Sequence, residues 1–225
     1  MRIAGKKFSP FIISVAAVVA VTAVILIISF SCSANKLTFE TTFYFICYRT
    51  EDNAVSASSV SGAVSSYGGA GYILEYDDSF FVTVACYYDG NDANTVCESL
   101  KRRDVNCEVI EISTDEYIIA NSSSANNKLY LGNLNTLQSL TTLAYGCANA
   151  IDTGEYGQAQ AKSVVTDIQN TLKGLLNANP DNCFSGEIRR LIAECTDVGE
   201  GYIYSKDLRR LQIAIADAII NIKLY

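Results

Sequence analysis

The pattern of apolar and polar positions divides the chain into an apolar N-terminal run, a region of alternating patterns and a helical region. Residues 11–31 form an uncharged apolar run that follows three basic residues, Arg2, Lys6 and Lys7. A run of about twenty apolar residues is long enough to cross a bilayer core as a helix, and basic flanks stay in the cytoplasm. Residues 1–35 are therefore predicted to be a cytoplasmic basic segment and a transmembrane anchor of a single-pass cell-membrane protein. The bulk of the chain is then extracytoplasmic. A cleaved signal peptide is the alternative.

Residues 36–113 carry alternating strand-like and helix-like patterns. Strands are predicted where β-branched and aromatic residues cluster, and helices where capping residues precede apolar residues at helical spacing. The predicted strands are residues 39–49, 72–76, 80–88 and 105–112, and the predicted helices are residues 54–66 and 93–103. The order βαββαβ predicts an α+β, ferredoxin-like domain in which a four-stranded antiparallel sheet carries both helices on one face.

Turn signals separate these elements. Residues 68–71, Gly-Gly-Ala-Gly, end a helix and lead into a strand, because glycine permits positive φ. A phosphate loop would need a following Lys and Ser or Thr, which this stretch lacks. Asp77 and Asp78 predict a hairpin turn. A catalytic carboxylate pair is not expected there, because the neighbouring sequence gives no apolar surroundings that would raise the pKa of a carboxyl group.

Side-chain alternation along the predicted strands sorts their residues into two faces. The face predicted to meet the two helices carries Phe43, Phe45, Cys47, Val82, Val84 and Cys86. The opposite face carries Tyr44, Ile46, Tyr48, Thr83, Ala85 and Tyr87. This second face is aromatic and uncharged, so it is either a binding platform or a surface that another part of the chain covers.

The pattern changes after residue 113. Residues 114–127 are rich in Ser, Asn and Asp and predict a polar linker. Residues 128–225 place apolar side chains at helical spacing in about four segments, which predicts an all-α helical bundle as a separate domain.

Composition and charge exclude several functions. The 225 residues have a formal charge of -7 and a pI near 4.6, which argues against nucleic acid as a partner. Histidine is absent, so the commonest general base and any His-containing metal site are missing. We therefore expect a protein that is not an enzyme and that holds no cofactor and no metal. The pairs Arg189-Arg190 and Arg209-Arg210 are expected on solvated helix faces.

The eight cysteines show no CxxC spacing, and several fall on apolar faces of predicted elements. A buried cysteine behaves as a small hydrophobic residue. Mostly free, buried thiols are therefore expected, and the sequence leaves one or two bridges open.

Residues 39–113 resemble a SPOR domain, the sporulation-related repeat of bacterial envelope proteins. The resemblance lies in the aromatic strand FYFICYR, the helix starts Asn53-Ala54 and Asp92-Ala93, the glycine before the second strand and the βαββαβ order. The resemblance implies a fold that binds denuded glycan strands of peptidoglycan on an exposed sheet face, in cell division or sporulation. On this chain the implied glycan-binding residues are Tyr44, Ile46, Tyr48, Thr83 and Tyr87.

Two functional hypotheses follow. In the first, a membrane-anchored protein binds peptidoglycan through the SPOR-like domain, and its helical bundle binds a protein partner. In the second, the protein is a non-catalytic structural or assembly protein that uses both domains for protein-protein contacts. The helices or another subunit then cover the tyrosine face, which is the second sheet face with Tyr44, Tyr48 and Tyr87.

Overall fold

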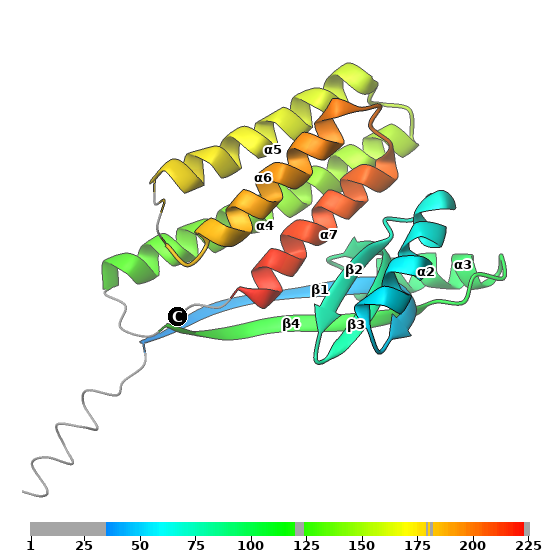
Figure 1. The fold of residues 1–225 in the computed structure, drawn as a ribbon, viewed down its shortest axis with the longest axis horizontal. Coiled ribbons are helices and arrows are strands. Elements are labelled where there is room, and N and C mark those ends of the chain that lie inside the picture. The colour runs from blue at the N-terminus through cyan, green and yellow to red at the C-terminus, as the bar shows by residue number, and fades with distance from the viewer. Residues whose placement is uncertain (1–34, 120–123, 179, 181, 223–225) are drawn as a thin grey trace, which may run out of the picture. The chain divides into compact units, whose positions relative to one another are not determined.

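The computed structural model describes residues 35–119, 124–178, 180 and 182–222 (Figure 1). From Lys36 onward the chain forms one compact unit. Its strands are β1 (Asn35–Glu51), β2 (Tyr72–Tyr76), β3 (Ser79–Tyr87) and β4 (Glu108–Ile119). Its helices are α2 (Ala54–Ser66), α3 (Gly90–Lys101), α4 (Ser124–Asp152), α5 (Gln158–Ala178), α6 (Ser185–Glu200) and α7 (Ser205–Asn221).

Local sequence signals explain several of these boundaries. The side chains of Asn53 and Asp89 cap α2 and α3, because each accepts a hydrogen bond from a backbone amide of the first turn. Asp77 and Asp78 adopt positive φ angles of 50° and 57°. Positive φ at both central residues is the signature of the two-residue hairpin turn that suits twisted strands. The succession of elements up to residue 119 is therefore the one that the sequence pattern predicts.

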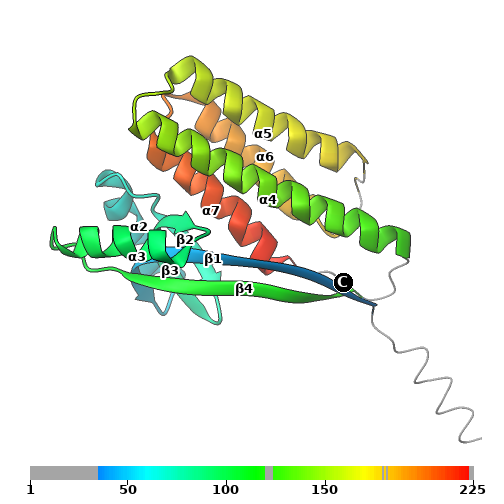
Figure 2. The same ribbon diagram turned by 180° about the vertical axis from the view of Figure 1, so that it is seen from behind.

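The four strands form one antiparallel sheet in the order β2-β3-β1-β4. Helices α2 and α3 pack against one face, where they enclose two small apolar clusters. The opposite face packs mainly against α7 of the C-terminal bundle, and the sheet and bundle share the largest apolar cluster. Figures 1 and 2 show α7 between the sheet and the other three helices of the bundle.

This arrangement contradicts the fold class predicted from the sequence. The sequence predicted a membrane helix, then a ferredoxin-like domain with helices on one face of its sheet, and then a separate helical bundle. The sheet instead has helices on both faces, and the bundle and sheet share a single core. The prediction was wrong because it gave the sheet and the helical bundle separate cores.

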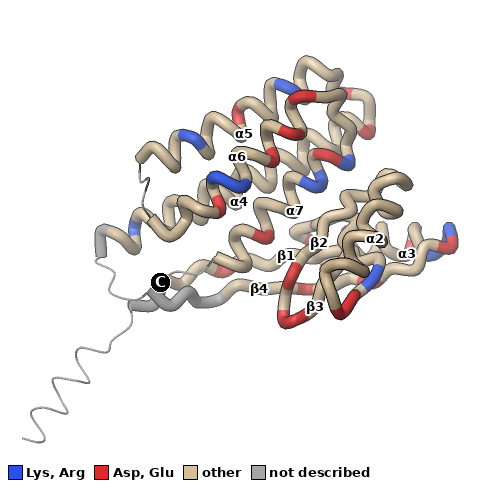
Figure 3. Tube along the Cα trace, viewed as in Figure 1, with Lys and Arg blue, Asp and Glu red and all other residues tan. Residues whose placement is uncertain are grey.

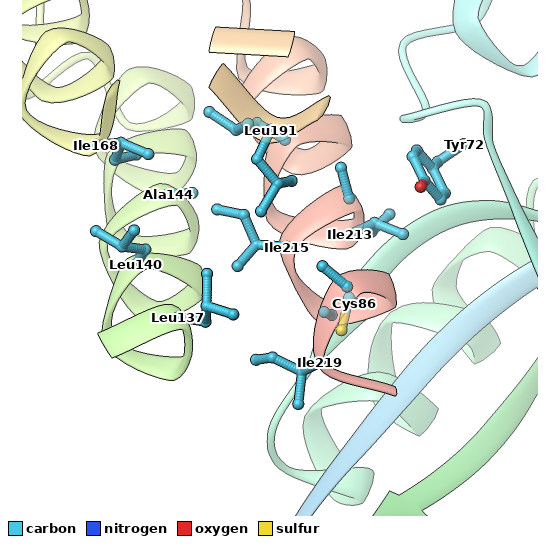
Figure 4. Packing of buried hydrophobic residues seen from close by; sticks show 14 of the residues in the cluster. Tyr72, Cys86, Leu137, Leu140, Ala144, Ile168, Leu191, Ile213, Ile215 and Ile219 are labelled. Carbon is cyan, nitrogen blue, oxygen red and sulfur yellow. The ribbon is translucent and has the colours of Figure 1, made fainter. Parts of the chain in front are cut away.

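Helix α7 causes this difference. Its apolar residues lie on all sides, and nine of its residues are buried. A helix that is apolar all round needs neighbours on every side. Figure 4 shows Ile213 directed towards Tyr72 and Cys86 of the sheet, whereas Ile215 lies towards Leu137 and Ala144 of α4.

The predicted membrane helix, residues 11–31, lies outside the described residues. No helix in the described part of the chain is long and apolar enough to cross a membrane. The prediction of a single-pass cell-membrane protein is corrected accordingly, since none of the described helices supports it.

The boundaries around the predicted linker also differ from the structure. Strand β4 continues to Ile119, and α4 begins at Ser124. Strand and helix therefore occupy most of residues 114–127. Part of the reason lies in Thr114, which is buried and donates a hydrogen bond from its hydroxyl to the carbonyl oxygen of Phe39 at 3.0 Å.

Gly71 provides a test of how α2 is joined to β2. It has a φ of 60°, and an added Cβ would lie 2.6 Å from the backbone carbonyl oxygen of Ser61. Gly71→Ala is therefore expected to lower the free energy of unfolding by about 2–3 kcal/mol, since the left-handed conformation and the close contact both oppose a side chain. Chemical denaturation measures this loss. The matched control is Gly62→Ala in α2, where nothing lies within 4 Å of an added Cβ. It should raise stability by about 0.5–1 kcal/mol, and equal effects at the two glycines would contradict the prediction.

Candidate functional site

The five residues predicted to bind glycan do not form an exposed platform. Ile46 and Thr83 are fully buried, and Tyr87 is 8% exposed. Tyr44 and Tyr48 are half-buried. Ile46 and Tyr87 belong to the apolar cluster beneath α3, and Tyr44 packs against that cluster. The hydroxyl of Thr83 donates to the carbonyl oxygen of Tyr72 at 2.9 Å.

Irregular pairing between β1 and β3 explains why simple alternation assigned the faces wrongly. The register shifts between Ile46 and Cys47 and again between Cys47 and Arg49. Each shift adds a residue to one strand and reverses the alternation beyond it. Phe43, Phe45 and Cys86 consequently face the bundle. Val82 and Val84 pack with α2, on the side where the sequence placed them.

Tyr48 is the predicted site residue with an opening beside it. It lines a small apolar pocket of about 120 Å³ between α2, β3 and the end of α3. The other lining residues are Val64, Tyr67, Gly69, Val84, Leu100 and Val105. Glycan recognition needs several hydrogen-bonding groups beside stacking rings, and this lining offers few.

A region lined mainly by polar and charged side chains lies along the outer edge of β2. Strand β2 is at one end of the sheet, so its outer side has no neighbouring strand. Tyr76 and Ser79 flank the two-residue turn. In such hairpins the two flanking residues form a hydrogen-bonded pair. Because the pairing alternates, Tyr72 and Leu74 direct their backbone groups inwards to β3, whereas Gly71, Ile73 and Glu75 direct theirs outwards.

Two side chains cap part of this edge. The hydroxyl of Ser61 donates to the carbonyl oxygen of Gly71. The side-chain amide of Asn221 donates to the carbonyl oxygen of Glu75 at 3.1 Å. Between these caps lie the amide and carbonyl of Ile73 and the amide of Glu75, for which the described residues provide no hydrogen-bond partner. An edge of this kind can pair with another extended chain.

A charged network connects β2 with α6 and α7 beneath this edge. The Tyr72 hydroxyl donates to the Asp217 carboxylate at 2.5 Å. Arg190 lies 3.0 Å from the Tyr72 hydroxyl and 3.2 Å from the Asp217 carboxylate. Arg190 also pairs with Glu187 at 2.8 Å. The Arg210 guanidinium lies 5.6 Å from the centre of the Tyr72 ring. The network holds β2 against the bundle through side chains that are far apart in the sequence.

Burial dominates the titration of this network. It raises the pKa of the Tyr72 hydroxyl well above its ordinary value, and the Asp217 charge adds to this effect. Burial also raises the pKa of Asp217, although hydrogen bonds from Tyr72 and Asn221 and the charge of Arg190 oppose the shift. For Arg190, burial lowers the pKa, but the acidic groups around it outweigh this and the net shift is upward. Tyr72 and Arg190 therefore keep their protons at neutral pH, which suits positioning rather than proton transfer.

Two clefts adjoin the β2 edge and share Tyr72 and Ile73. The larger has a volume of about 620 Å³, and the smaller has a volume of about 390 Å³. Their charged lining residues are Glu75, Asp77, Asp78, Glu194, Asp217, Arg190 and Arg210. Both arginines are ion-paired with acidic residues. Figure 3 shows acidic positions in red around the turn between β2 and β3.

The clefts have an excess of negative charge. Within the described residues, no lysine or arginine forms an ion pair with Glu75, Asp77 or Asp78. Among the same residues, no group of three or more Cys, Asp or Glu side chains is placed to hold a metal ion. We name the outer edge of β2 with these two clefts the β2 edge groove.

Sequence reasoning did not identify the residues of this groove. Arg190 was expected on a solvated helix face, and Asp77 and Asp78 were assigned only to a turn. Asp217 carried a usable signal, because it is the single charged residue in the apolar stretch from Leu211 to Ile222. A lone charge in an otherwise buried helix indicates a specific partner.

Comparisons with protein-family models, with curated proteins and with solved structures gave no match to this chain.

Proposed function

We propose that this protein is a non-catalytic assembly protein that binds an extended segment of a partner protein along the β2 edge groove. The observation that carries the proposal is the open stretch of backbone at Ile73 and Glu75, bounded by the side-chain caps from Ser61 and Asn221. An added strand gains affinity from main-chain hydrogen bonds and specificity from its alternate side chains.

Charge complementarity favours a basic partner segment. Five acidic side chains and two ion-paired arginines line the two clefts. Lysine or arginine side chains on an added strand would lie near Glu75, Asp77 and Asp78. Attraction of this kind speeds association and weakens as salt increases. The formal charge of -7 on the whole chain acts in the same direction.

Peptidoglycan binding stays a prediction from the SPOR resemblance. The geometry favours protein assembly instead, because helices cover both faces of the sheet. The hypothesis of an assembly protein already allowed for a tyrosine face covered by helices. The β2 edge groove now supplies a specific contact surface for it.

A matched pair of substitutions at Ile73 tests the proposal. The probe is a short capped peptide of alternating lysine and valine, titrated into the full chain by calorimetry at low salt. Ile73→Pro removes the outward amide, which edge strands tolerate, and is expected to weaken binding about tenfold. Ile73→Ala loses similar packing against the α2 cluster but keeps the amide, so it should bind like the unchanged protein.

Two peptide controls separate strand addition from simple charge attraction. A peptide with glutamate in place of lysine should not bind, because the clefts are acidic. A lysine peptide that is N-methylated on alternate residues keeps its charge but loses main-chain donors, and it should bind as weakly as Ile73→Pro binds the original peptide. Equal binding of the methylated and unmethylated peptides would overturn the proposal.

A further inference from the structure

Two cysteines lie in direct sulfur contact on the α3 side of the sheet. The Sγ atoms of Cys97 and Cys107 are 3.0 Å apart. Cys97 belongs to α3, and Cys107 immediately precedes β4. The two side chains are 2% and 4% exposed, respectively. Two unbonded sulfur atoms in ordinary van der Waals contact lie farther apart than this, so the backbone already holds the pair close to bonding distance.

The chain between the two cysteines fixes this approach. Helix α3 ends in a tight turn in which the amide of Val105 donates to the carbonyl oxygen of Leu100 at 3.1 Å. Asp104 completes the turn with a φ of 59°. Cys107 then packs beside Cys97, and its thiol lies 3.4 Å from the Cys97 carbonyl oxygen. The contact is therefore a product of the helix end and not of flexible side chains alone.

We propose that Cys97 and Cys107 are a disulfide-forming pair, which closes when the chain folds in the presence of a disulfide oxidant. The two thiols lose two protons and two electrons, and one S–S bond forms between them. The S–S bond of the oxidant, for example glutathione disulfide, takes up both electrons and both protons and becomes two thiols. The product ties the end of α3 to the start of β4.

The other described cysteines do not compete for this bond. Seven described cysteines are free thiols, and six of them are buried. Among them, Cys97 and Cys107 alone have a sulfur-sulfur contact. Burial raises the pKa of Cys47 to about 11 and that of Cys195 to about 12, as it does for Cys107, so the sulfur contact and not the pKa distinguishes the pair.

Burial of the two thiols also decides when the disulfide bond forms. Burial, together with its contact to Cys97, raises the pKa of Cys107 to about 12. Thiol–disulfide exchange requires a thiolate and access to the oxidant. Exchange is therefore expected during folding, before α3 closes over the sheet, and the folded reduced protein should oxidise slowly.

Redox-controlled refolding of the full chain tests the proposal. The reduced, unfolded protein is refolded with mixed reduced and oxidised glutathione, free thiols are alkylated, and peptides are mapped by mass spectrometry without reduction. The expected result is one dominant internal bridge between Cys97 and Cys107, with a chain lighter by two hydrogen atoms. Adding a reductant should lower the melting temperature by several degrees, because the bridge restrains the unfolded chain.

Variants provide the controls. Cys97→Ser and Cys107→Ser should each abolish the bridge and the redox-dependent part of the melting temperature. Cys183→Ser, which removes a half-buried thiol elsewhere, should leave both unchanged. Full alkylation of Cys97 and Cys107 in the refolded wild-type chain, or a dominant bridge between other cysteines, would overturn the proposal without depending on any variant.

Discussion

Ile215→Ala is expected to lower the free energy of unfolding by about 2–5 kcal/mol, the cost of truncating a fully buried aliphatic side chain. Ile215 is fully buried on α7, and it faces α4 (Figure 4). Because α7 also packs against the sheet, the loss should destabilise the sheet and the bundle together. Chemical denaturation followed by circular dichroism and by tyrosine fluorescence should give one coincident transition at lower denaturant.

The shared core makes this prediction specific. If the sheet and the bundle were separate domains, the bundle would unfold first in the variant and the two probes would separate. Leu143→Ala on α4 is the matched control, because Leu143 is 40% exposed. It should change stability by less than about 0.5 kcal/mol.

Arg190→Met is expected to cost about 2–3 kcal/mol of stability, because it leaves the half-buried carboxylate of Asp217 without its cation. Breaking a fully buried ion pair costs about 3–5 kcal/mol. The Arg190 side chain is 35% exposed, so solvent screening lowers the expected loss. The double substitution Arg190→Met with Asp217→Asn should recover much of it, and a double-mutant cycle measures the coupling.

The pH dependence of the Arg190→Met variant gives an independent check. Burial raises the pKa of Asp217, so the folded state holds the carboxyl proton more tightly than the unfolded state, whose pKa is about 3.9. The resulting stability is complete below the unfolded pKa and is lost as pH rises through the folded pKa. Loss of the guanidinium raises the folded pKa further. The deficit of the variant should therefore be larger at neutral pH than near pH 4, and a deficit that does not depend on pH would contradict this account.

Local chemistry could be read from the sequence wherever a few adjacent residues decide the conformation. Asn53 caps α2 as expected. Helix α3 begins three residues earlier than predicted, with Asp89 in place of Asp92 as its cap. Asp77 and Asp78 form the hairpin turn. These positions depend on hydrogen bonds and φ angles within a short stretch of chain, so they need no information about distant contacts.

The faces of the sheet could not be read in the same way. Alternation predicts a face only while the pairing stays regular, and the shifts around Cys47 interrupt it. The residues of the candidate site could not be predicted from the sequence either. Tyr72, Arg190 and Asp217 meet only because β2, α6 and α7 pack together, and their separation along the chain hides this contact.

The sequence by itself determined the succession of strands and helices in residues 36–113, the helical character of the C-terminal part and the acidic charge of the molecule. These properties follow from side-chain periodicity, capping and composition, which are local or additive. The tertiary structure alone decided that α7 covers the second sheet face, that the tyrosine face lies under α2 and α3, and that β2 keeps an open edge. Each of these depends on which apolar surfaces meet, and apolar burial is non-directional, so the order of residues does not specify the partner.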